Sequence, residues 1–153
     1  MSNKALAKAL REFVRLKTTT IYSLSDWLGP RSHRRGALRL AKAMARYRGL
    51  PIERARSGAE VRALEILRDA GIELPRLNVD VAGEEADLSW PRERLIIEID
   101  GGPYHQDVGA DARKEAVWRD ARWDVFRIDS DDVYDHPGPL VEIAPAPIRN
   151  VRR

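Results

Sequence analysis

The chain has 153 residues, enough for one sizeable core with a small appended domain, and contains no cysteine. The lack of cysteine excludes disulfides, thiolate metal sites and cysteine catalysis. No stretch approaches the roughly 20 apolar residues of a membrane span, and no apolar signal segment follows the start. We therefore expect a cytoplasmic protein that has no membrane partner.

The net charge of +3 hides two oppositely charged parts. Residues 1–56 carry 14 Lys and Arg against three acids, a net charge of +11, whereas the remainder carries 13 against 21, a net charge of −8. Basic side chains on solvated helix faces account for part of this excess. Clustered cations also gain affinity for a polyanion by releasing counterions from its phosphates, so the other interpretation is that a polyanion lies against the first part.

Three helices are predicted in residues 1–56. KALAKALREFVRLK (4–17) places apolar residues at helical spacing opposite a basic face. A short helix follows, with Ser23 or Ser25 as its N-cap and Gly29-Pro30 as its end. A third helix over 31–49 ends at Gly49. Both a helix-turn-helix-like reader and an ordinary basic bundle fit this pattern. The residues predicted to bind DNA here are Arg34, Arg35, Arg39, Lys42 and Arg46.

From residue 57 the pattern changes. SGAEVRALEILRDAG (57–71) predicts an amphipathic helix, in which Ser57 and Glu60 have the spacing of a capping box. LNVDVAG and EEADLSW (77–90) alternate around a turn at Gly83 and predict two strands. The nearly continuous apolar run LIIEI (95–99) predicts a third strand that is central and covered on both faces.

The last part of the chain predicts a crossover. ADARKEAVWRDARW (110–123) reads as a helix and WDVFRID (123–129) as a strand parallel to the third one. The order from residue 57 is then α-β-β-β-α-β on a mixed sheet, with a final helix around Pro139 to Ile143. We expect a basic helical segment at 1–56, one domain at 57–144 and an irregular tail at 145–153. The aromatic residues expected in the core are Trp90, Trp118, Trp123 and Phe126.

Carboxylates stand where the buried third strand ends. Glu98 and Asp100 are two residues apart and project from the same face, and Asp87 lies on the adjacent strand. An unpaired charge out of water costs several kcal/mol, so the negative charges of these acids must be compensated by a positive partner. One solution is a hard cation such as Mg²⁺ between the carboxylates. The other is ion pairing with nearby arginines, and the residues alone leave both open. The candidate arginines are Arg92, Arg94 and Arg127.

Four ordered motifs resemble a known family. Glu60, DLSWP (87–91), EIDGGPYH (98–105) and DARKEAVWRDARWDVFRI (111–128) are similar to the PD-(D/E)XK nuclease superfamily, and most to its branch of very-short-patch-repair endonucleases and related bacterial endonuclease-like domains. The likeness spans residues 57–135. It implies a restriction-endonuclease-like fold and an endodeoxyribonuclease that uses Mg²⁺, or Mn²⁺ as a substitute, in DNA repair, recombination, mobile elements or defence.

The resemblance also implies roles for single residues. Asp87, Glu98 and Asp100 would ligate the metal, and His105 would polarise or deprotonate the attacking water. Asp100 replaces the lysine of the D/E-x-K triplet, so Lys114 on the crossover helix is the candidate for the displaced positive charge. Arg122 replaces a glycine that the pattern expects before Trp123. The further residues implied are Glu60 at the site, Tyr104 at the base stack and Arg113 at a phosphate.

Two other classes of function stay open on these residues. The missing lysine favours a nucleic-acid-binding module with a degenerate site. The N-terminal helices also suit a protein partner, as in a toxin or regulatory component of a defence system. A homodimer is compatible with either class.

Overall fold

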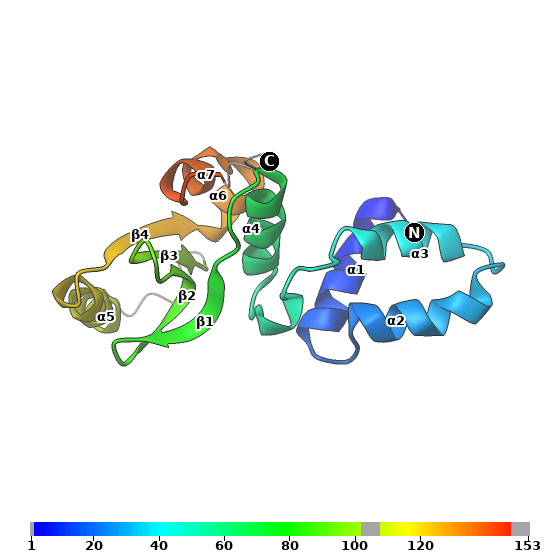
Figure 1. The fold of residues 1–153 in the computed structure, drawn as a ribbon, viewed down its shortest axis with the longest axis horizontal. Helices are drawn as coiled ribbons and strands as arrows, with labels where there is room; N and C mark the ends of the chain where they lie inside the picture. The colour runs from blue at the N-terminus through cyan, green and yellow to red at the C-terminus, as the bar shows by residue number, and fades with distance from the viewer. Residues whose placement is uncertain (1, 102–107, 148–153) are drawn as a thin grey trace, which may run out of the picture. The chain divides into compact units, whose positions relative to one another are not determined.

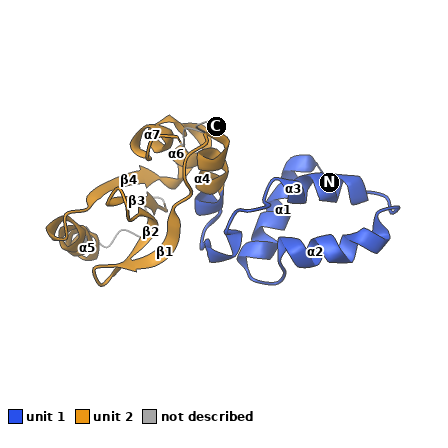
Figure 2. Cartoon of the chain, in the orientation of Figure 1, with its two compact units in different colours: residues 1–61 blue, residues 62–153 orange. Residues whose placement is uncertain are grey.

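The computed structural model of the protein describes residues 2–101 and 108–147. The chain divides into two compact units, residues 1–61 and 62–153, which are coloured separately in Figure 2. The division falls inside helix α4 (Gly58–Asp69).

Unit 1 contains the three predicted helices, α1 (Asn3–Arg15), α2 (Ile21–Leu28) and α3 (Ala37–Ala45). Two short 3-10 turns, η1 (Gly29–Arg31) and η2 (Ile52–Arg54), follow α2 and α3. The core of the unit is made of buried apolar side chains from the helices and the turn after α3. They include Leu10, Val14, Met44, Tyr47 and Ile52.

Three details of unit 1 differ from the prediction, and the first is the end of α3, which lies at Ala45 and not at Gly49. The N-cap of α2 is Thr20, whose hydroxyl accepts from the Ser23 amide at 3.0 Å, so Ser23 lies in the first turn and neither Ser23 nor Ser25 is the cap. The third helix begins at Ala37, because Gly36 has a φ of +89°, a left-handed conformation that an α-helix does not contain. Arg34 and Arg35 therefore precede the helix instead of lying on it.

Unit 2 is built on a four-stranded sheet in the order β1-β2-β3-β4 (Figure 1). The elements after α4 are β1 (Arg76–Val81), β2 (Glu84–Trp90), β3 (Leu95–Asp100), α5 (Val108–Asp120) and β4 (Asp124–Asp129). The first two pairings are antiparallel and β3 pairs with β4 in parallel, which confirms the predicted α-β-β-β-α-β order and mixed sheet. Strand β3 is central, and its residues 95–98 are buried.

Turns and helix ends follow local residue chemistry. Ala82 and Gly83 both have positive φ, as a tight two-residue hairpin loop requires. Helix α4 ends at a left-handed Gly71, where the Ile72 amide donates to the Leu67 carbonyl at 2.9 Å. Helix α5 ends in the same way, but with Arg122 in the left-handed position at a φ of +63°. The glycine expected from the family pattern therefore corresponds to a backbone conformation that favours glycine.

Helices lie on both sides of the sheet in Figure 1, with α5 on one side and α4, α6 (Ser130–Asp135) and α7 (Gly138–Ile143) on the other. Helix α7 was predicted. The sequence reading missed α6, whose first turn is capped by the Asp129 side chain accepting from the Asp131 amide.

The indole of Trp118 is fully buried and packs against Val81, Ala86 and Ile96. Trp90 is also buried and Trp123 is partly buried, as expected. The expectation for Phe126 was wrong, since its side chain is 43% exposed on edge strand β4. In the described residues no helix is both long and apolar enough to cross a membrane.

Candidate active site

Asp87 and Glu98 face each other where the pairing of β2 with β3 ends. The register joins Leu88 to Ile97, and one step further along it Asp87 stands opposite Glu98. There the two carboxylates, in place of main-chain carbonyls of the opposite strand, accept hydrogen bonds from main-chain amides. The Asp87 amide donates to Glu98 Oε1 at 2.9 Å, and the Ile99 amide donates to Asp87 Oδ2 at 2.9 Å. These two bonds hold both carboxylates against the strand ends.

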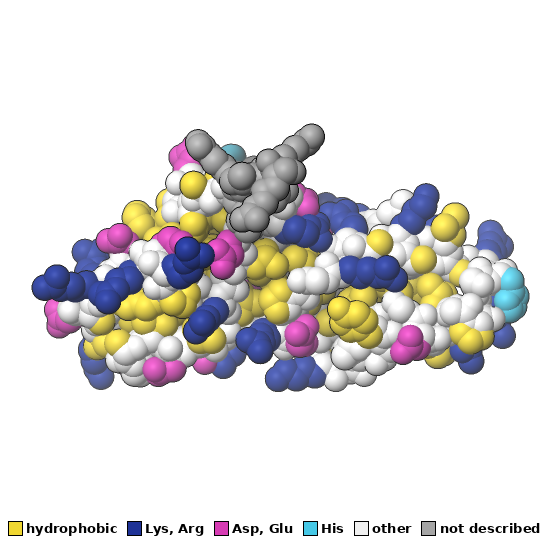
Figure 3. Space-filling view, in the orientation of Figure 1, with side chains coloured by type: hydrophobic (Ala, Val, Ile, Leu, Met, Phe, Trp, Pro, Cys, Tyr) yellow, Lys and Arg dark blue, Asp and Glu magenta, His cyan; other side chains and the backbone are white. Residues whose placement is uncertain are grey.

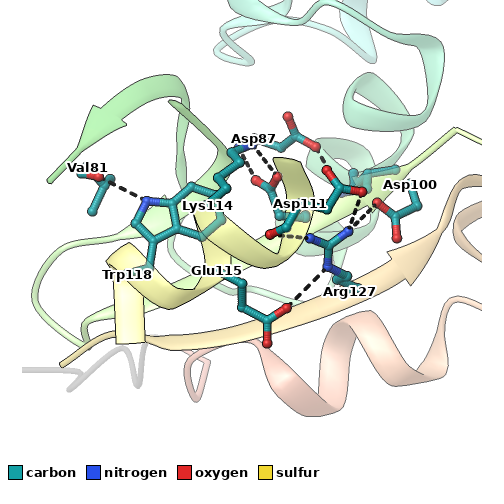
Figure 4. A network of polar contacts seen from close by, with 10 residues as sticks. Val81, Asp87, Asp100, Asp111, Lys114, Glu115, Trp118 and Arg127 are labelled. Atoms are coloured by element: carbon teal, nitrogen blue, oxygen red, sulfur yellow. Dashed lines mark hydrogen bonds and ion pairs between the residues drawn. The ribbon is translucent and has the colours of Figure 1, made fainter. Parts of the chain in front are cut away.

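Lys114 reaches this pair from helix α5. Its Nζ lies 2.6 Å from Glu98 Oε2, and Glu98 is buried while Lys114 is about three-quarters buried. The same Nζ lies 4.7 Å from the centre of the Trp118 ring, a cation–π distance, and the Trp118 indole donates to the Val81 carbonyl at 2.9 Å (Figure 4). Lys114 is thus held between Glu98 and a fixed aromatic ring.

A second polar cluster surrounds Arg127 on β4. Its guanidinium lies 3.4 Å from Asp100 Oδ1, 3.2 Å from Asp111 Oδ2 and 3.6 Å from Glu115 Oε2 (Figure 4). Burial by itself would lower the pKa of Arg127, but the attraction of Asp100, followed by Asp111 and Glu115, outweighs it and raises that pKa above its ordinary value. Arg127 therefore keeps its charge, and it pairs with the carboxylate of Asp100.

Strained backbone lies next to the pair of acids. In the register of β1 with β2, Leu77 faces Leu88 and Val79 faces Ala86, so Asn78 between them stands opposite Asp87. Asn78 has a φ of +50°, the left-handed region, in the middle of a strand. Asn tolerates this conformation better than most residues, and strain of this kind tends to cluster at functional sites.

Glu60 serves the start of α4. Its Oε2 accepts from the Arg56 amide at 2.9 Å, and the Ser57 hydroxyl accepts from the Glu60 amide at 3.1 Å. These reciprocal bonds are those of a capping box, with the carboxylate taking the amide one residue before the N-cap. A part for Glu60 in the active site stays a prediction. Tyr104 and His105 lie outside the described residues, and Arg113 is exposed on α5.

The basic residues predicted to bind DNA lie on unit 1, around α3. Arg34, Arg35, Arg39, Lys42 and Arg46 are all exposed. Sequence reasoning missed the contribution of three residues on α5, namely Asp111, Glu115 and Trp118. Their signal was the spacing of four residues, which stacks Asp111 on Glu115 and Lys114 on Trp118 along one helix.

The fit of a divalent metal depends on the carboxylates that come together. Across residues 2–101 and 108–147, no three His, Asp or Glu side chains are placed to hold a metal ion among themselves. Asp100 is paired with Arg127, which leaves Asp87 and Glu98 as facing hard oxygen donors. Mg²⁺ is usually bound through one or two carboxylates, with waters and substrate phosphates completing its shell. Asp87 and Glu98 fit that pattern and would hold such an ion.

Comparisons with known proteins give one similar structure. No family profile matches the sequence, and no curated protein is significantly similar to it. Among solved structures the chain is similar to the Homing Endonuclease I-Bth0305I Catalytic Domain, with 24% sequence identity and a TM-score of 0.49, over 57% of this chain and 90% of that domain.

Proposed function

We propose that the protein is a metal-dependent endodeoxyribonuclease with its active site at Asp87, Glu98 and Lys114. The observation that carries the proposal is the 2.6 Å contact between Lys114 Nζ and Glu98 Oε2, beside Asp87. Two carboxylates and an ammonium thus meet at the open end of the β2–β3 hairpin, away from its turn. Lys114 supplies from a helix the positive charge that the D/E-x-K pattern would place at position 100.

The reaction proposed is hydrolysis of a phosphodiester. A water molecule loses one proton and its oxygen forms the new bond to phosphorus, the bond from phosphorus to the leaving sugar oxygen breaks, and that oxygen takes up one proton. A bound divalent cation supplies Lewis-acid stabilisation of the phosphoryl charge. Asp87 and Glu98 orient the reacting groups, and the Lys114 ammonium stabilises negative charge that develops on the phosphate oxygens. His105, the predicted proton acceptor, lies outside the described residues.

Unit 1 would hold the DNA by its backbone. Phosphate contacts set the position and affinity of a protein on DNA without reading the bases. The exposed cations around α3 and the net charge of +11 over residues 1–56 support this role.

Plasmid cleavage tests the nuclease directly. Supercoiled plasmid is incubated with the protein in Mg²⁺, Mn²⁺ or EDTA, next to the variants Asp87→Asn and Asp124→Asn. Asp124 is an exposed acid at the start of β4 and serves as the matched control. We expect cleavage with either metal by the wild type and by Asp124→Asn, and a loss of about 10²-fold or more in Asp87→Asn.

Thermal melting separates a lost site from a lost fold. The side-chain amide oxygen that Asp87→Asn introduces can still accept from the Ile99 amide, so this variant should melt no lower than the wild type in EDTA. Mg²⁺ should raise the melting temperature of the wild type alone, because a ligand that binds only the native state stabilises it. Full cleavage by Asp87→Asn, or strong destabilisation together with no effect of Mg²⁺ on the wild type, would contradict the proposal.

A second candidate function is a DNA-binding module without hydrolysis. The contact of Asp100 with Arg127 favours it, because that contact leaves two facing carboxylates where the family pattern implies three. DNA binding by the wild type with no cleavage in either metal would select this candidate.

A further inference from the structure

Two adjoining hollows open on the surface of unit 1. One, of about 300 Å³, lies where the end of α2 and the turn before α3 meet α1. The other, of about 310 Å³, lies between α1 and α3. Leu6 and Arg39 line both hollows, so the two adjoin each other. We call them together the basic groove.

The charged side chains that line the basic groove, which we call its rim, are cations. Among the described residues, no acid lines either hollow. The rim residues are Arg31, Arg34, Arg35, Arg39, Lys42 and Arg46. Figure 3 shows dark blue Lys and Arg side chains interspersed with yellow apolar ones on the visible face of this unit. Such a rim selects a polyanion, and five of its six cations are arginines, whose planar forks match phosphate oxygens and stack on aromatic faces.

The uncharged side chains that line the first hollow, which we call the floor of the basic groove, are apolar. Binding to the backbone of a duplex does not require an apolar floor. Leu6, Leu28 and Leu40 line the first hollow together with Trp27. The Trp27 side chain is 52% exposed, and the Arg31 guanidinium lies 4.8 Å from its ring centre while Arg31 also donates to the Trp27 carbonyl at 2.8 Å. A half-exposed aromatic ring stacked on an arginine is a surface to which a nucleobase can add its own face.

The size of the hollows separates two polyanions. Small-molecule pockets run from roughly 300 to 1,000 Å³, so each hollow is at the small end and suits one ring system. An acidic amphipathic helix would instead need a trough about 10 Å wide that takes several aliphatic side chains in a row. Bases of a paired duplex are stacked inside it and cannot reach such a floor. Unpaired bases can.

We propose that the basic groove binds a single-stranded stretch of nucleic acid, with phosphates on the arginine rim and an unpaired base beside Trp27. The groove takes no part in hydrolysis, and the inference rests on the proposed role of unit 1 in holding nucleic acid, not on the nuclease activity. It adds that the nucleic acid bound by the protein contains unpaired bases.

Fluorescence anisotropy with three labelled ligands of equal length tests the inference. They are a thymidine oligonucleotide, the same strand with its central bases removed as abasic sites, and a duplex. Binding is measured in EDTA with the full chain carrying Asp87→Asn, so no cleavage interferes and the outcome does not depend on nuclease activity. We expect the intact strand to bind about 5- to 150-fold more tightly than the abasic strand, the range that one stacked base contributes.

Variants assign the effect to the groove. Trp27→Ala should remove the preference for the intact strand, and Trp27→Phe should keep part of it, because a smaller ring still stacks. Tyr22→Ala is the matched control, since Tyr22 is a 73% exposed aromatic residue on α2 that does not line the groove. Arg35→Ala should weaken the intact and the abasic strands equally.

Three results would overturn the inference. Equal binding of intact and abasic strands would mean that only phosphates are recognised. Tighter binding of the duplex would place the groove on paired DNA. Displacement of the strand by an acidic amphipathic helical peptide, but not by unstructured polyglutamate at equal charge concentration, would point to an acidic protein partner instead.

Discussion

The two units of the chain treat their charged side chains in opposite ways. Around α3 in unit 1 the cations are exposed and, among the residues that the structure describes, no acid lines the groove that they surround. In unit 2 the charges at the sheet are partly buried and paired, Lys114 with Glu98 and Arg127 with Asp100 and Asp111. Exposed cations keep most of their water and contribute little to stability, which is compatible with their proposed role in holding nucleic acid. Paired charges that are partly out of water hold one another in place and so fix the positions of these side chains.

This contrast has an energetic consequence. Substitutions at exposed surface positions usually change the free energy of unfolding by less than about 0.5 kcal/mol. Removing one partner of a partly buried ion pair leaves the other uncompensated and costs about 1–3 kcal/mol. Variants in unit 1 should therefore change binding with little change in stability, whereas variants of the Arg127 cluster should change stability.

The largest effect is expected at Lys114. Lys114→Met should lower kcat/KM for plasmid cleavage about 10²- to 10³-fold, because the ammonium near the phosphate is lost, and Lys114→Arg should retain part of the activity. DNA affinity should stay within about twofold of the wild type if, as proposed, unit 1 supplies most phosphate contacts. The control is Arg119→Met, which removes a cation that is 64% exposed on the same helix. Cleavage at the wild-type rate by Lys114→Met would show that the charge there is structural.

The next effect separates the units by salt dependence. Log affinity falls with log salt concentration, and each phosphate contact contributes about −0.9 to the slope. The slope of the double variant Arg35→Ala/Lys42→Ala should therefore be less steep by about 2. The matched variant Arg92→Ala/Arg119→Ala removes two exposed cations from unit 2 and should leave the slope unchanged. The slopes are measured by anisotropy in a salt titration. Equal losses in both variants would mean that DNA contacts are spread over both units.

Stability is expected to respond most at Arg127. Arg127→Met should lower the free energy of unfolding by about 2 kcal/mol, measured by urea denaturation, since Asp100, Asp111 and Glu115 then face one another without a cation. Because the pKa of Arg127 is raised on folding, its contribution is fully present below the ordinary arginine pKa and is lost only as pH rises through the higher folded value. The difference in the free energy of unfolding between the wild type and Arg127→Met should therefore persist at a pH of about 9, where the guanidinium is still charged. An unchanged midpoint would mean that the cluster is solvated.

The smallest effect is a gain in stability at the end of α5. Arg122 has a φ of +63°, a conformation that costs an L-residue about 1–2 kcal/mol and glycine almost nothing. Glycine is also more flexible in the unfolded chain, so Arg122→Gly should stabilise by about 0.5–1 kcal/mol net. The control is Arg119→Gly, one turn earlier in ordinary helical conformation, which should destabilise by up to about 1 kcal/mol. Loss of stability in both variants would contradict this account.

The sequence by itself determined the features that depend on neighbouring residues. Hydrophobic periodicity was enough to predict the order α-β-β-β-α-β, and the run at 95–98 was enough to predict a buried central strand. The Ser57–Glu60 spacing predicted a capping box, and the Gly83 turn predicted a hairpin. In the capping box and the hairpin turn the bonded residues lie within a few positions of one another, and in the helices and strands the apolar period lies within one element, so the local chain carries the signal.

The tertiary structure decided which charges meet. Glu98 and Asp100 lie on the same face of one strand, yet Glu98 binds Lys114 on α5 and Asp100 binds Arg127 on β4. The choice depends on the parallel register that puts Arg127 next to Glu98 and on the turn of α5 that faces the sheet. Phe126 was misjudged for the same reason, because only the strand order makes β4 an edge. Partners 16 and 27 residues apart in the chain are brought together by packing, and no local pattern of residue types specifies that distance.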